Sequence, residues 1–337
     1  MTVMQTSHVL PDAEAALIAG QLDYLPVGFF GSVMGLTGLS VAWQFAHMRY
    51  DAPEWIAHIL GVAAVVAFIA LSISYLIKLV TSPKVVKAEF RHPIVANLFG
   101  TILISLLLLP IVIEPVALQL AQAMWIVGAL GMALFAWMMM KRWMNDRQQL
   151  AHATPAWMIP VVGLLDLPLA LPKLGLPPMH GVMAASLAIG LFFAIPMFTL
   201  IFSRLVFEER MPAALEPTLL ILVAPFAVGT STYAVVVGQI DLFAEGLYAL
   251  TLFMLTVLFG RLRFMAAACP FRVSWWAISF PLAASAIAGL RVAEARPSLT
   301  TDAIALVLLA LASAVIIGLL VRTVIGIARG ELRLLST

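Results

Sequence analysis

Ten apolar segments, each long enough to cross a bilayer, dominate this sequence and leave few folds open to it. A helix that spans the hydrocarbon core needs about 20 mostly apolar residues. The segments lie at residues 26–46, 55–77, 94–114, 116–140, 156–173, 180–203, 215–237, 243–260, 273–293 and 302–326. The chain is 63% hydrophobic and only 11% charged, unlike a soluble domain. The sequence predicts an all-α integral membrane protein with ten transmembrane helices in a lipid bilayer.

The fifth segment is the weakest of the ten. It carries an acid, Asp166, together with Pro160 and Pro168. If this segment does not span the membrane, the count falls to nine or the topology changes.

The basic residues predict the orientation. Fifteen of the 19 Lys and Arg residues follow the even-numbered segments, and four follow the odd-numbered ones. Positive charge gathers on the cytoplasmic side of a membrane. We therefore expect a multi-pass protein of the cell inner (plasma) membrane with both termini cytoplasmic. Residues 1–24 are the expected N-terminal tail, 25–328 the ten-helix domain and 329–337 the C-terminal tail. The first two dozen residues lack the positive start and apolar core of a cleavable signal peptide.

Prolines separate the odd segments from the even ones. Among the even segments only the sixth contains an interior proline, Pro196. The odd segments contain Pro110, Pro160, Pro168, Pro225 and Pro281. A proline inside a helix removes a backbone hydrogen bond and kinks the helix. The pattern predicts five helical hairpins, each with a kinked first helix and a straighter second helix. A chance distribution of prolines is the alternative.

Small side chains form a stripe along each odd segment, at helical spacing. The stripes are Gly28, Gly31, Gly35 and Gly38; Asn97, Thr101 and Ser105; Gly163, Asp166 and Ala170; Ala224, Ala227, Ser231 and Ala234; and Ala277, Phe280, Ala284 and Ala288. A small stripe often serves only close helix packing. Five stripes on the five odd segments favour a shared narrow pore, with Gly31, Gly35, Ser231 and Ala284 among its lining residues. No Lys or Arg is evident on these stripes, so selection is expected to rest on pore width, helix dipoles and the basic cytoplasmic rim.

Phe280 is the one large side chain in the ninth stripe, and Pro281 follows it directly. A ring projecting into a lumen of small residues would obstruct that lumen, and the proline would fix its direction. Packing against a neighbouring helix is the alternative role for the ring.

The sequence does not favour an enzyme. It contains no H-E-x-x-H pair, no G-x-S-x-G elbow and no phosphate-binding Gly-Lys motif. The single Cys269 excludes an internal disulfide and a cysteine metal cluster. No cofactor and no metal are therefore expected. A formal net charge of +2 does not suggest a nucleic-acid partner.

Four segments carry a family resemblance. They are "LPVGFFGSVMGLTGLSVAW" at 25–43, "KAEFRHP" at 87–93, "LILVAPFAVGTSTY" at 220–233 and "WAISFPLAAS" at 276–285. On these motifs the chain resembles the tellurite-resistance and dicarboxylate-transporter family, which includes bacterial TehA proteins, yeast malate and sulfite transporters and plant slow anion channels.

The resemblance implies five helical hairpins around a quasi-fivefold axis, with the odd helices lining a central pore. It implies a homotrimer with one pore per protomer that passes small inorganic or organic anions. Ser279-Phe280 matches the place of the phenylalanine that occludes the pore in TehA-like members. Pro110, Pro160, Pro225 and Pro281 fall where such members kink their inner helices.

Asp166 departs from the TehA pattern and leaves a second function open. An intramembrane acid is costly and is a candidate functional residue. The alternative is a proton-coupled carrier of C4-dicarboxylates (malate type) or a sulfite/tellurite exporter that uses Asp166. A helix-capping role for Asp166, or a neighbouring basic partner, would make it structural.

Overall fold

The computed structural model describes residues 22–177, 179–268 and 271–336, and side chains throughout these except at 261–268. The described residues form helices and no strand. Ten helical spans, which we number in chain order, are long and apolar enough to cross a membrane. The predicted count of ten is therefore confirmed, the weak fifth span included. Cys269 lies outside the described residues, as does the expected N-terminal tail apart from residues 22–24.

The even spans are uninterrupted α-helices of 27 to 30 residues. They are α3 (Glu54–Thr81), α7 (Leu118–Asn145), α10 (His180–Phe207), α12 (Leu242–Ala268) and α14 (Leu299–Ala328). At a rise of about 1.5 Å per residue, each exceeds the thickness of the hydrocarbon core. Pro196 lies inside α10 without dividing it.

The odd spans are divided, and each begins as a 3-10 helix. Span 1 comprises η1 (Val27–Phe30) and α2 (Gly31–Tyr50). Span 3 comprises η2 (Val95–Phe99), α5 (Gly100–Leu108) and α6 (Pro110–Ile113). Span 5 comprises η4 (Pro155–Met158), α8 (Ile159–Val162), η5 (Gly163–Asp166), α9 (Leu167–Ala170) and η6 (Leu171–Lys173). Span 7 comprises η7 (Ala213–Val223) and α11 (Ala224–Val237), and span 9 comprises η8 (Val273–Ile278) and α13 (Ser279–Ala295).

The prolines of the odd spans mark these divisions. Four of them, Pro110, Pro160, Pro168 and Pro225, occupy the first or second position of an α segment. Pro281 is the third residue of α13. In the first turn of an α-helix the missing N–H of proline costs little, because that N–H has no partner within the helix. Pro160, Pro168 and Pro225 therefore mark where 3-10 geometry gives way to α geometry, and Pro110 marks where α6 begins after α5.

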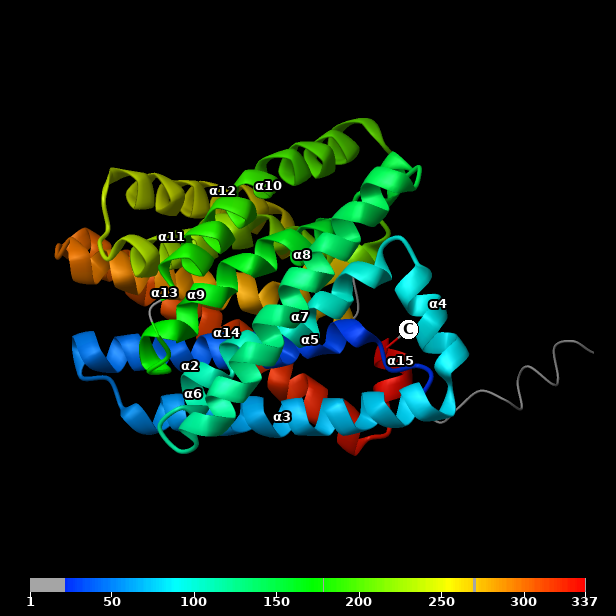
Figure 1. Ribbon diagram of the computed structural model, residues 1–337, viewed down its shortest axis with the longest axis horizontal. Coiled ribbons are helices and arrows are strands. Elements are labelled where there is room, and N and C mark those ends of the chain that lie inside the picture. The colour runs from blue at the N-terminus through cyan, green and yellow to red at the C-terminus, as the bar shows by residue number, and fades with distance from the viewer. Residues whose placement is uncertain (1–21, 178, 269–270, 337) are drawn as a thin grey trace, which may run out of the picture.

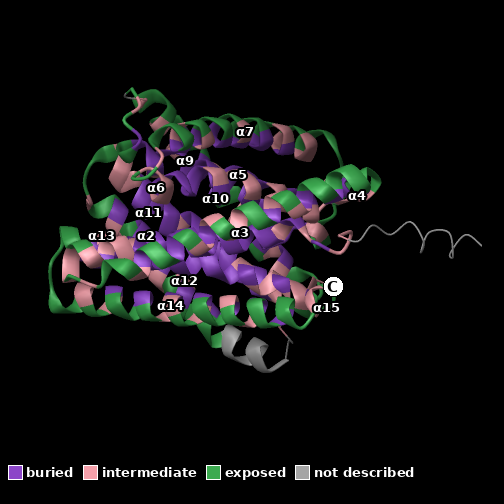
Figure 2. Ribbon diagram, turned by 90° about the horizontal axis from the view of Figure 1, so that it is seen from below, coloured by how far each residue is buried: buried purple, intermediate pink, exposed green. Residues whose placement is uncertain are grey.

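Burial separates the two classes of span into layers. The most apolar windows of the odd spans are 61–89% buried, whereas those of the even spans are 22–33% buried. Buried residues accordingly gather in the middle of the molecule, while α3, α7 and α14 present exposed residues on their outer sides (Figure 2). The odd spans form an inner layer, and the even spans form an outer layer with an apolar surface suited to lipid.

The five inner spans close into a ring. The helix α2 contacts α5 and α13, α11 contacts α13, and span 5 contacts both α5 and α11. The 3-10 segments η1, η2, η4, η7 and η8 also contact one another in a closed ring, so the inner spans run parallel. Each outer helix packs on the inner span that precedes it, which gives five hairpins. We call the face where the odd spans begin the N face and the opposite face the C face.

Both described ends of the chain lie on the N face, as an even number of spans requires. The short helix α15 (Leu332–Ser336) lies near the beginning of span 1 (Figure 1). Pro26 and Leu335 line the same hollow. A second short helix on this face, α4 (Pro83–Arg91), is held by the fully buried Lys78, whose Nζ donates to Glu89 at 2.7 Å and to the Leu25 carbonyl at 2.7 Å.

Candidate conduit through the inner ring

Two cavities lie inside the ring of odd spans. The N cavity, of about 60 Å³, receives residues from the first halves of all five inner spans, such as Gly31, Thr101, Asp166, Ala224 and Ala277. The C cavity, of about 130 Å³, receives residues from their second halves, such as Gln44, Ile111, Lys173, Ser231 and Arg291. The two cavities therefore follow each other along the axis of the ring.

Phe280 and Val228 line both cavities and so lie between them. Phe280 is only 8% exposed. Its ring faces Gly38 of span 1, where a Cβ would lie 3.6 Å from the Phe280 Cδ2. A Cβ at Gly38 would be at ordinary van der Waals distance from that ring but only 2.9 Å from the Ala283 Cβ, so the glycine lets span 1 pack closely against Ala283 of span 9.

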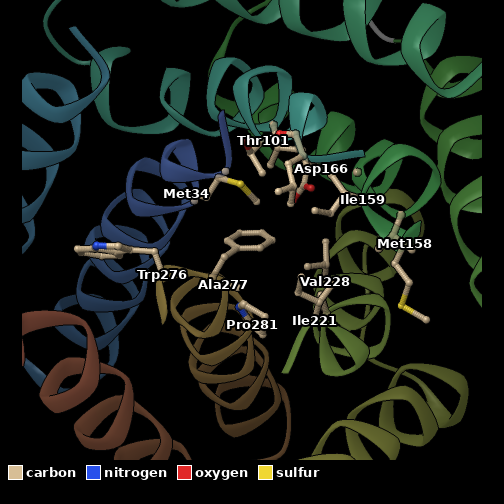
Figure 3. Close-up of a pocket in the computed structure, with 18 residues that line it drawn as sticks. Met34, Thr101, Met158, Ile159, Asp166, Ile221, Val228, Trp276, Ala277 and Pro281 are labelled. Atoms are coloured by element: carbon tan, nitrogen blue, oxygen red, sulfur yellow. Dashed lines mark hydrogen bonds between the residues drawn. The ribbon is translucent and has the colours of Figure 1, made fainter. Parts of the chain in front are cut away.

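The N cavity is almost wholly apolar. Met34, Thr101 and Asp166 lie on one side of it, and Ala277, Pro281 and Val228 lie on the other (Figure 3). The Thr101 hydroxyl donates to the Leu98 carbonyl at 2.6 Å. Asp166 is the only one of the described lining residues of this cavity that has an ionisable side chain.

A third hollow, which we call the mouth, adjoins the N cavity on the N face. It has a volume of about 190 Å³ and shares Gly28, Leu98 and Ala277 with the N cavity. Arg272 and Leu335 also line it, so α15 forms part of its wall. Mouth, N cavity and C cavity form a series that runs from one face of the ring toward the other.

Asp166 is 1% exposed and lines the N cavity, and its Oδ1 has no hydrogen-bond partner. It occupies the N-cap position of α9, but its side chain makes no capping hydrogen bond. It forms no ion pair with a described residue. Neither the capping role nor the basic partner therefore accounts for this carboxyl group.

The predicted site residues separate into cavity-lining and packing positions. Gly31, Asp166 and Pro281 line the N cavity, Ser231 and Ala284 line the C cavity, and Phe280 lines both. Gly35, Pro110, Pro160 and Pro225 are buried and line neither cavity. Gly35 is in close contact with Ser279, and the three prolines begin α segments.

The expectation that no Lys or Arg lies on the wall is wrong for the C cavity. Both Lys173 and Arg291 line it. The signal was present in the sequence, because Arg291 continues the stripe of Phe280, Ala284 and Ala288 by one helical step. The sequence interpretation counts Arg291 only among the four basic residues that follow the odd-numbered segments.

Comparison with known proteins decides the family. Residues 24–324 match the family described as SLAC1, voltage-dependent anion channel. This chain belongs to the SLAC1 family. Its members include anion channels and TehA-type proteins, so the family is one of anion channels and transporters and not one of enzymes. The resemblance expected from the four sequence motifs is thereby confirmed.

Three relatives of this SLAC1-family protein illustrate the match. It is 28% identical to the S-type anion channel SLAH3 of Arabidopsis thaliana, over 89% of this chain and 48% of the relative. It is 24% identical to the guard cell S-type anion channel SLAC1 of the same plant, over 89% and 55%. It is 26% identical to the tellurite resistance protein TehA homolog of Haemophilus influenzae, over 78% and 79%. The chain thus spans about half the length of these two plant relatives.

Within the described residues, no three His, Cys, Asp or Glu side chains gather to hold a metal ion. What the inner ring offers is a series of hollows, with Phe280 and Val228 between the N cavity and the C cavity.

Proposed function

We propose that this protein is an anion channel whose conduit runs through the ring of odd spans and is closed by Phe280. The observation that carries the proposal is that Phe280 and Val228 are the two residues shared by the N and C cavities. The ring of Phe280 then separates two hollows that would otherwise join. A narrow apolar constriction also blocks ions by excluding water.

The charge distribution supports anions as the permeant species. Fifteen of 19 basic residues belong to the N face, where they raise the local anion concentration by long-range attraction. Lys173 and Arg291 line the C cavity at the other end. A cation approaching from either end would meet like charge.

The same proposal covers the cellular setting. We place the protein in the inner (plasma) membrane as a homotrimer, with both termini cytoplasmic. The basic N face supports this orientation, and the family resemblance supports the trimer and the passage of small inorganic or organic anions.

The test is nitrate and chloride flux through purified protein in liposomes. Phe280→Ala removes the ring without adding a polar group, so anion flux should rise sharply while thermal stability stays near that of the wild type. If the ring serves packing alone, the truncation would cost about 3–5 kcal/mol of stability and open no conduction. A Phe280→Ala variant that is destabilised and does not conduct would refute the gating role of Phe280.

A proton-coupled carrier is the second candidate, and Asp166 favours it. Its carboxyl group lines the N cavity, and one of its oxygens is buried without a partner. An unpaired carboxylate in apolar surroundings is strongly disfavoured, whereas a protonated carboxyl group avoids that cost. A group that gains and loses a proton beside the conduit would couple anion movement to protons.

A further inference from the structure

We infer that the C cavity contains an anion-binding site formed by Lys173 and Arg291, with the Ser231 hydroxyl as a third donor. The ligand class is a small oxyanion. This inference deepens the proposed function and rests on it, because it names where a permeating anion would pause.

The first argument is a contrast among the four basic residues at the ends of the odd spans. Arg49 pairs with Asp302 at 2.7 Å, and Arg296 pairs with Glu245 at 2.7 Å. Lys173 and Arg291, which line the C cavity, have no carboxylate within ion-pair distance among the described residues. The two basic residues that face the cavity are therefore the two whose charge is left for a ligand.

Arg291 is held in place by its surroundings and still has a free donor. Its guanidinium carbon lies 4.6 Å from the centre of the Phe45 ring, at cation–π distance. Its Nε is buried and has no hydrogen-bond partner. A buried N–H without a partner is unfavourable, and more so when the group is charged, so an acceptor that enters the cavity would relieve that cost.

Ser231 supplies an independent indication of a ligand. It is 3% exposed and lines the C cavity, and its Oγ makes no hydrogen bond. The other buried hydroxyls on α11 behave differently, since Thr230 donates to the Phe226 carbonyl and Thr232 donates to the Leu165 carbonyl. The hydroxyl that faces the cavity is thus the one that remains unsatisfied.

Lys173 links the site to the surface. It is exposed, and its Nζ donates to the Gln44 Oε1 at 3.0 Å. The amide N–H groups of Gln44, which also lines the cavity, remain as donors. Lys173 therefore combines a cavity-lining charge with access from the C face.

The parallel inner spans explain why cations are needed at this end. Their C-termini point toward the C face, and a helix C-terminus carries about half a negative charge. An anion would be repelled there without compensation. Glu114 interacts electrostatically with Lys173, and Glu294 with Arg291, but neither acid forms an ion pair with its basic partner. The two basic side chains thus offset a field that opposes anions.

The donor set favours an oxyanion over a halide. A guanidinium group presents paired N–H donors that match two oxygens of a planar or tetrahedral anion. The cavity volume of about 130 Å³ leaves room for such an anion. Nitrate is a suitable probe, and chloride is the comparison.

The experiment measures the thermal unfolding midpoint of the full chain in detergent while nitrate replaces gluconate at constant ionic strength. The midpoint of the wild type should rise and saturate with nitrate, and less so with chloride. Arg291→Gln and Lys173→Gln should each raise the half-saturating nitrate concentration by about tenfold or more. Arg291→Lys should keep protection by chloride and lose the preference for nitrate.

Arg296→Gln is the matched control, because it removes the same charge from the same face but from a residue already paired outside the cavity. It should leave half-saturation unchanged. If Arg291→Gln and Arg296→Gln have the same half-saturating nitrate concentration, the proposed site is refuted. The binding readout does not require conduction, so failure of Phe280→Ala to conduct would refute the channel and leave the site to be judged separately.

Discussion

Gly35 in span 1 lies so close to Ser279 in span 9 that a Cβ on the glycine would overlap both the Oγ and the Cβ of the serine. Rotation of the serine side chain cannot relieve this overlap, because its Cβ is involved. The Ser279 hydroxyl is also engaged, donating to the Trp276 carbonyl at 2.6 Å. The close approach of α2 and α13 places Phe280 against span 1.

We predict that Gly35→Ala destabilises the protein by about 1–3 kcal/mol, because the two helices must separate. Thermal or denaturant unfolding in detergent measures the change. The double variant Gly35→Ala with Ser279→Gly should recover much of the loss, since it removes both overlapping atoms. Gly318→Ala, at a site with no atom within 4 Å, is the control and should be neutral or stabilising. Equal effects at positions 35 and 318 would contradict the packing argument.

Anion flux should follow the size of the side chain at position 280. Phe280→Leu should conduct less than Phe280→Ala and more than the wild type, and Phe280→Trp should stay closed. Val228→Ala should raise flux modestly, because Val228 borders the same constriction. Flux in liposomes, measured with unfolding midpoints for every variant, tests the series. Flux that does not depend on side-chain size would exclude Phe280 as the obstruction.

Replacing Asp166 by Asn tests proton coupling with little change of shape. If Asp166 couples protons, uptake driven by a pH gradient should be abolished while expression and folding are kept. Uptake of labelled malate and sulfite into vesicles, with and without an imposed gradient, provides the measurement. Unchanged flux with unchanged pH dependence would leave the passive channel as the function.

The free energy of unfolding should fall as the pH is lowered, because His92, in the link between α4 and span 3 on the N face, becomes protonated. The Nδ1 of His92 accepts hydrogen bonds from the N–H groups of Ile94 and Val95, at 3.2 Å each. Partial burial, followed by repulsion from His152 and Arg142, lowers the pKa of His92 below its usual value of 6.5. The folded state therefore favours neutral His92, so this contribution is present above pH 6.5 and is lost as the pH falls through the lowered pKa.

His92→Asn keeps a side-chain acceptor for the same N–H groups and does not titrate. The unfolding midpoint of this variant should depend less on pH between 7.5 and about 5 than that of the wild type. Parallel pH profiles of wild type and His92→Asn would contradict the role assigned to His92.

Cysteine labelling tests the orientation. In a Cys269→Ala background, Lys84→Cys on α4 should be protected from an impermeant thiol reagent added outside the cell. Val116→Cys should react, because it is 91% exposed in the link between spans 3 and 4 on the C face. External labelling at position 84 would reverse the assigned orientation.

Some features of this protein follow from the sequence by itself. The ten spans could be predicted because apolarity over about 20 residues is a local property that lipid demands. The division of the odd spans was signalled by prolines such as Pro110 and Pro225, since the lost N–H acts within one turn. The family could be predicted from the motifs around Gly31 and Phe280, and the match over residues 24–324 confirmed it.

Only the tertiary structure decided which members of each stripe reach a cavity. Gly38 and Thr101 do, while Gly35 and Asn97 do not. Asn97 lies in the 3-10 segment η2, where 3.0 residues per turn rotate a face drawn at 3.6 away from its expected direction, whereas Gly35 lies within α2 and packs against Ser279.

The tertiary structure also decided the electrostatics of the conduit. Asp302 lies 253 residues from Arg49 and neutralises it, whereas no acid among the described residues forms an ion pair with Arg291. Whether a basic residue is paired or left for a ligand depends on contacts between spans far apart in the chain. Helix periodicity and composition carry no information about such contacts, because they describe each span in isolation.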